Sequence, residues 1–197
     1  MKKLTLEWNA VTTWDDPERQ GHASLGKIVQ AHQTLFKVGI VTTAASENLM
    51  DQNFPKSAAD FRERLKSVGW AHLELINTLA ITGLTFIGSS RWAPNSGNKE
   101  LVEKLWDVLP GTIRSSSREF AKENCIPDDC SITSPPYRRW RNAWCDVHSL
   151  EAHISARRDV FVTNDRKNFK GPKKAQLLEL GVGDICTYDE AWEKYGG

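Results

Sequence analysis

The chain has no long hydrophobic run. None of its apolar stretches approaches the roughly 18 to 20 residues that a membrane-spanning helix needs. The start, Met1-Lys2-Lys3, leads into a short strand-like segment and not into the apolar core of a signal peptide. Internal repeats and low-complexity tracts are also absent. We therefore expect a soluble, cytoplasmic protein with no membrane partner.

Cysteine is scarce and follows no metal-binding pattern. There are four cysteines, with no CxxC pair and no histidine at zinc-finger spacing. Their positions are Cys125, Cys130, Cys145 and Cys186. We expect buried or idle thiols, and a Cys125–Cys130 disulfide or metal clip is the alternative.

The chain also has almost no net charge. Lysine and arginine total 26 against 25 acidic residues, which leaves a formal charge of +1. Any affinity for nucleic acid must therefore come from a local patch. With 197 residues and 40% hydrophobic content, the chain is long enough for one domain over 1–197.

Short apolar strands alternate with helical segments along the chain. Expected strands are 3–6, 39–43, 73–76, 84–87, 159–163 and 184–187, and expected helices are 22–36, 44–51, 61–68, 101–109, 144–157, 175–180 and one from 189. This alternation predicts an α/β fold with a parallel sheet and helices on both faces. A polar, proline-interrupted segment predicts a surface loop or insertion around 110–140.

Four acidic residues are expected at one edge of that sheet. Glu7 and Asp165 follow strands, while Glu47 and Asp146 lie near the starts of helices. In right-handed β-α-β units, strand carboxyl ends and helix amino ends share one edge. Four carboxylates there would repel one another unless a cation neutralised them, and Mg²⁺ or Mn²⁺ prefers such oxygen ligands. The alternative is that each acid is only favoured by a helix dipole or solvated.

The same segments resemble the PIN-domain family. The match is good over the last third, where Asp146–His153 supplies an acidic helix, 158–165 a strand ending in Thr-x-Asp, and 184–190 a final strand and helix start. Leu6–Asn9 resembles the family's first motif, with Glu7 in place of the usual Asp, and 45–47 resembles its second acidic motif.

The resemblance implies a Rossmann-like three-layer α/β/α domain and a Mg²⁺- or Mn²⁺-dependent endoribonuclease that hydrolyses RNA phosphodiester bonds. It also implies a toxin neutralised by an antitoxin protein, and a homodimer stays open. By position, Glu7, Glu47, Asp146 and Asp165 would be metal ligands. Asn9 and Thr163 would orient them or a water.

Arginines interleaved with aromatics precede the Asp146 helix. Arg138, Arg139 and Arg141 suit a phosphate backbone, and Trp140 and Trp144 suit unstacked bases. The alternative is a solvated loop whose tryptophans pack in the core. We interpret the nearby histidines, His148 and His153, as packing or surface residues because their spacing places them on different helix faces.

Two other function classes compete with the nuclease. One is a PIN-like binding or scaffold module with weak or no catalysis, which the Glu7 substitution favours. The other is a doubly wound phosphatase or receiver-type domain, and it lacks an Asp-x-Asp nucleophile motif after the first strand.

Overall fold

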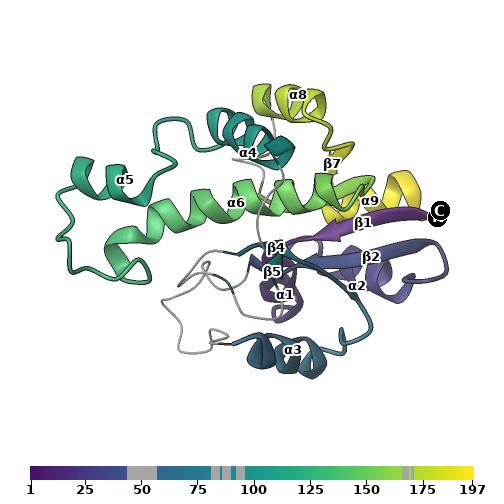
Figure 1. Cartoon of the computed structure of the whole chain (residues 1–197). Coiled ribbons are helices and arrows are strands. Elements are labelled where there is room, and N and C mark those ends of the chain that lie inside the picture. Colours follow the sequence, from purple (N-terminus) through teal and green to yellow (C-terminus); the bar gives the residue numbers. More distant parts are fainter. Residues whose placement is uncertain (44–56, 81–84, 86–89, 92–95, 166–168, 170) are drawn as a thin grey trace.

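The fold is built on a five-stranded parallel sheet (Figure 1). The computed structural model describes residues 1–43, 57–80, 85, 90–91, 96–165, 169 and 171–197. The strand order is β3-β2-β1-β6-β7, with β1 at Lys2–Leu6, β2 at Phe36–Val41, β3 at Glu74–Ile76, β6 at Val160–Val162 and β7 at Asp184–Cys186. A second parallel pair joins β4 (Thr78–Leu79) to β5 (Ser90–Arg91). The predicted parallel α/β sheet is confirmed.

Helices cover both faces of the sheet and make three layers (Figure 1). One face carries α1 (Asn9–Trp14), α2 (His22–Gln30), α3 (Ala58–Ser67) and α9 (Tyr188–Tyr195). The other carries α4 (Ser96–Val108), α5 (Ser117–Glu123), α6 (Arg138–Ser155) and α8 (Pro172–Glu179). Each face has its own hydrophobic cluster, so the architecture is compatible with a Rossmann-like sandwich.

Strand β6 shows why the sheet forms here. Val160 and Val162 join the cluster under α1 and α2, whereas Phe161 joins the cluster under α6, and all three are fully buried. Successive side chains of a strand point to opposite faces. A run of β-branched and aromatic residues is therefore what a strand covered on both faces requires.

The segment around 110–140, predicted as a surface loop or insertion, contains helical elements. It contains α5 and a 3-10 turn at Pro135–Tyr137, and α6 begins at Arg138 instead of near residue 144. Phe120, Tyr137 and Trp140 pack with α4 in one cluster. We call α4, α5, the turn and the first half of α6 the helical lobe. Burial of these aromatics compensates for the polar local sequence.

Gly39 lies inside β2. A Cβ at this residue would lie 2.9 Å from Arg158 Nη2 and 2.9 Å from Ile76 Cδ1. The missing side chain thus leaves room for the Arg158 guanidinium. That group is buried and donates hydrogen bonds to the carbonyls of Leu4 and Lys37, each at 2.6 Å, and to Glu74 Oε2 at 2.8 Å.

The four cysteines are free, as expected. Cys145 is fully buried on α6, and its thiol donates to the Thr43 carbonyl at 3.3 Å. Burial raises the pKa of Cys186 to about 12, with the neighbouring Asp184 adding to the rise. Cys125 is exposed in the helical lobe. Among the described helices, none combines the length and apolar character needed to cross a membrane.

Candidate functional site

Strands β1 and β6 define the point where the strand order reverses. They are neighbours in the sheet, but the chain continues from β1 towards β2 and from β6 towards β7, on opposite sides. Ligands of open α/β sheets bind outside the carboxyl ends of the strands at such a switch point. Leu6 pairs with Val162, so Glu7 and Thr163 leave the sheet side by side.

Glu7 is held in a buried hydrogen-bond network. Only 3% of the residue is exposed, and its Oε1 accepts a hydrogen bond of 2.5 Å from Asn9 Nδ2. The same amide nitrogen lies 3.5 Å from Thr163 Oγ1, a weak contact at this length. Asn9 begins α1, two residues after Glu7, because the chain turns directly from β1 into a helix. The Asn9 amide therefore bonds the Glu7 carboxylate directly.

Thr163 connects the end of β6 to Asp165. Its backbone N–H donates to the Cys186 carbonyl at 2.9 Å, which extends the pairing with β7 by one residue. Its hydroxyl oxygen accepts a bond of 2.9 Å from the Asp165 backbone N–H. A threonine side chain that bonds the backbone two residues on fixes a turn. This turn holds the half-buried Asp165 next to the Glu7 network.

Asp146 lies on α6 where that helix passes the end of β2. Its neighbour Cys145 bonds the Thr43 carbonyl, and Ser149 Oγ lies 3.1 Å from Thr43 Oγ1. Thr43 follows β2, whose Ile40 pairs with Leu6. Asp146, which is half-buried, is therefore placed at the carboxyl edge. One stretch of helix thus brings a third acid to the end of the sheet that holds Glu7 and Asp165.

The described residues do not form the predicted four-carboxylate metal site. The fourth predicted ligand, Glu47, lies outside the described residues. Across those residues, no group of three or more His, Cys, Asp or Glu side chains is arranged to hold a metal ion. The available donors at this edge are carboxylate oxygens, which suit Mg²⁺ or Mn²⁺ better than a softer metal.

The three predicted RNA-contacting arginines differ in exposure. Arg138 and Arg139 are exposed in the first turn of α6. Arg141 is 1% exposed, and its Nη1 donates to the carbonyls of Ile132 (2.7 Å) and Ser134 (2.6 Å). This arginine holds the chain before the 3-10 turn in place and cannot reach a phosphate in this conformation. The expectation for Arg141 is thus corrected to a structural role.

The aromatics near these arginines belong to the core. Trp140 and Trp144 are 3% and 1% exposed, and Trp140 Nε1 donates to the Arg114 carbonyl at 3.1 Å. Their faces are covered by the helical lobe, so they are not stacking platforms for bases. The alternative reading, tryptophans tucked into the core, is the one that the structure supports.

Both α6 histidines are packing residues, as expected. His153 Nδ1 lies 2.8 Å from Thr5 Oγ1, and Nε2 lies 2.6 Å from the Val182 carbonyl. Burial lowers the pKa of His153 to about 4. Burial, with the positive charge of Arg91 adding to it, lowers the pKa of His148 to about 3. Both rings are therefore neutral near pH 7.

These histidines are expected to weaken the fold as pH falls below about 6.5. The unfolded chain then binds protons that the folded chain excludes, so the unfolding free energy falls with pH, by at most about 2.7 kcal/mol per pH unit for the two groups. The contribution is complete above pH 6.5 and is lost progressively towards pH 4 for His153 and towards pH 3 for His148. Thermal midpoints at pH 7.5 and 5 measure this loss. His153→Gln should reduce this loss, and a parent profile that is flat between these two pH values would contradict the prediction.

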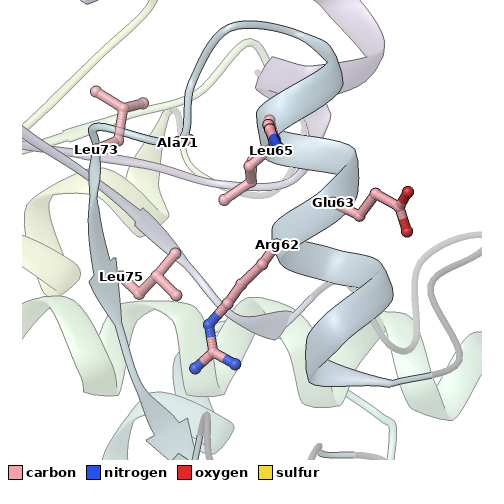
Figure 2. Close-up of a pocket in the computed structure, with 7 residues that line it drawn as sticks. Arg62, Glu63, Leu65, Ala71, Leu73 and Leu75 are labelled. Carbon is pink, nitrogen blue, oxygen red and sulfur yellow. The ribbon is translucent and has the colours of Figure 1, made fainter.

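A groove of about 520 Å³ lies away from these acids, between α3 and the edge strand β3 (Figure 2). Its lining residues are Arg62, Glu63, Leu65, Lys66, Ala71, Leu73 and Leu75. Leu65 and Leu75 face each other across it, while Glu63 points outwards (Figure 2). Strand β2 separates β3 from β1, so the groove and the switch point are different places.

Sequence reasoning missed one residue of the network. Tyr188, fully buried at the start of α9, donates its hydroxyl hydrogen to Asn9 Oδ1 at 2.8 Å. A buried tyrosine hydroxyl usually finds a polar partner, and this partner is part of the site.

Fold and site together define a class: an α/β protein with a parallel sheet flanked by helices and a buried, hydrogen-bonded glutamate at the switch point. No family model, no curated protein and no solved structure matches the chain. The function must therefore be argued from the residues themselves.

Proposed function

We propose that this protein is a PIN-like, divalent-metal-dependent endoribonuclease. One observation carries the proposal: Glu7 and Asp165 follow the two adjacent strands at the switch point and are linked through Asn9 and Thr163. A carboxylate that is 3% exposed and oriented by an amide is preorganised for binding a ligand. A merely solvated acid at a strand end needs no such network.

The proposed metal ligands are Glu7, Asp146 and Asp165, with Glu47 as the fourth. Their oxygens match the preference of Mg²⁺ and Mn²⁺. When bound, such an ion supplies charge neutralisation at a phosphodiester and lowers the pKa of a bound water. The chain's own contribution is to fix Glu7 through Asn9 and to fix the Asp165 turn through Thr163.

RNA is the proposed substrate because exposed cations flank this edge. Arg138 and Arg139 begin α6, and Asp146 lies about 12 Å further along the same helix at 1.5 Å per residue. Arginine suits phosphate oxygens, and a strand held there would cross the acidic edge. A toxin role with an antitoxin partner belongs to the same proposal and is tested only after the activity.

The test is to incubate the protein with end-labelled single-stranded RNA over a series of Mn²⁺ concentrations, from about equimolar to a large excess. A parallel reaction contains a chelator. The expected result is internal cleavage that the chelator abolishes. RNA that is bound but uncut with Mg²⁺ and with Mn²⁺ would instead favour the binding or scaffold module. Release of phosphate from a small phosphoester, with RNA intact, would favour the phosphatase class.

A further inference from the structure

Tyr188 reaches the acidic edge from the opposite end of the chain. Its hydroxyl donates to Asn9 Oδ1 across a sequence separation of 179 residues, and Asn9 Nδ2 donates onward to Glu7 Oε1. The two bonds are 2.8 Å and 2.5 Å long. A hydrogen-bonded chain therefore runs from α9 through the Asn9 amide to the buried carboxylate.

The direction of this chain depends on which way the amide points. An asparagine amide has one accepting and one donating end, and rotation by half a turn exchanges them. In the rotated state, Asn9 Oδ1 would face Glu7 Oε1 at hydrogen-bond distance. Both atoms are acceptors, so they would repel each other. This repulsion disfavours the rotated state, and the Tyr188 hydroxyl, which donates to Oδ1, anchors the amide in the state in which Nδ2 faces Glu7.

The tyrosine ring is itself fixed on several sides. Tyr188 is fully buried, and it is the first residue of α9, where Thr187 and Glu190 form a reciprocal capping box. Gly21, at φ +84°, passes so close that a Cβ there would lie 2.9 Å from Tyr188 Cδ2. Asn164 Nδ2 holds this turn by donating to the Gln20 carbonyl at 2.8 Å.

We infer that Tyr188 is a positioning residue that locks the Asn9 amide and thereby orients the Glu7 carboxylate for a divalent ion. The inference rests on the proposed function for the ion, but the lock itself belongs to the ion-free protein. Without the hydroxyl, the Asn9 amide loses the bond that anchors its oxygen, and Glu7 is held by a less firmly positioned partner. The contacts of the ring with Gly21 involve only carbon atoms of Tyr188, so a phenylalanine at this position would keep them.

The test compares Tyr188→Phe with Tyr195→Phe. Both variants remove a hydroxyl from α9, but the Tyr195 hydroxyl donates to Asp184 Oδ2 at 2.9 Å, away from the acidic edge. Calorimetric titration with Mn²⁺ should show affinity about tenfold weaker in Tyr188→Phe, as for other groups that orient metal ligands. Tyr195→Phe should bind as the parent does.

Two further readouts separate positioning from a general loss of structure. In RNA cleavage, Tyr188→Phe should need more Mn²⁺ but regain the parent rate at saturating ion, with KM for RNA unchanged. In the ion-free protein, the ¹⁵N side-chain amide resonances of Asn9 should shift in Tyr188→Phe and not in Tyr195→Phe. Asn9→Ala should weaken Mn²⁺ binding similarly, and the double variant should not be additive.

The outcomes distinguish the two proposals. If the parent binds no Mn²⁺, the proposed function fails, and the Asn9 resonances alone decide the inference. If the parent binds Mn²⁺ and Tyr188→Phe binds it equally with unchanged Asn9 resonances, the inference is overturned while the proposed function stands. Unfolded Tyr188→Phe protein would shift the decision to the Asn9→Ala titration, where parent-like affinity also overturns the inference.

Discussion

Replacing Asp165 by asparagine is expected to reduce Mn²⁺-dependent RNA cleavage by about a thousandfold. Loss of one carboxylate that helps to hold a catalytic ion removes several kcal/mol of transition-state stabilisation, and about 4 kcal/mol corresponds to that factor. Asparagine preserves the shape of the side chain, and the turn survives because Thr163 bonds the backbone of residue 165. Glu7→Gln should cause a similar loss for the same reason. Single-turnover rates on labelled RNA measure both.

Asp159→Asn is the matched control. It makes the same replacement of a carboxylate by an amide, but at the opposite end of β6. Asp159 Oδ2 accepts from the Lys3 backbone N–H at 2.8 Å, at the amino edge of the sheet. This variant should cleave at close to the parent rate. Retention of more than a tenth of the parent rate by Asp165→Asn at every Mn²⁺ concentration would remove Asp165 from the site.

Arg158→Met is expected to lower the free energy of unfolding by about 3 kcal/mol, within the range for breaking buried charged interactions. The guanidinium donates to carbonyls on both β1 and β2 and to Glu74, whose side chain is 41% exposed. Burial raises the pKa of Glu74, but Arg158 and Lys37 outweigh this effect and leave the pKa lowered. Denaturant unfolding followed by tryptophan fluorescence measures the change.

Lys37→Met separates the buried contacts from simple charge. Lys37 Nζ lies 3.5 Å from the same Glu74 carboxylate, but its side chain is 46% exposed, so we expect less than about 1 kcal/mol. Arg158→Lys keeps the charge and loses the fork that reaches two strands, and it should resemble the Met variant. Equal stability of parent and Arg158→Met would show that methionine packing replaces these bonds.

The sequence predicts the C-terminal elements well because each carries its own local signal. The apolar run 160–162 and the Thr187–Glu190 capping pattern need no distant partner to be recognised. Helix α1 has six residues and α5 has seven, too short for a periodic pattern to stand out. The start of α6 follows Pro135-Pro136 and reads as a loop, since its helix depends on burying Trp140 against the lobe.

In the candidate site, too, the sequence predicts the placement of elements but not the contacts between distant side chains. The order of strands and helices places Glu7, Asp146 and Asp165 towards the same edge of the sheet, but the described residues form no group of three acidic side chains arranged to hold a metal ion. The Tyr188 contact could not be predicted, because it depends on the orientation of side chains 179 residues apart. The roles of Arg158 and Arg141 could not be predicted either, because an arginine in a sequence is usually interpreted as solvated or ligand-binding. Both residues are at least 95% buried and donate hydrogen bonds to backbone carbonyls.

The four cysteine side chains differ in burial, so a thiol-reactive label should attach to them selectively. The thiolate is the reactive form of cysteine, and a pKa of about 12 leaves Cys186 almost fully protonated at neutral pH. Cys145 is fully buried on α6 and Cys130 is half-buried, whereas Cys125 is exposed just after α5. A maleimide dye applied to the native protein should therefore attach to Cys125 before either buried thiol, giving the lobe a fluorescent reporter without touching the acidic edge.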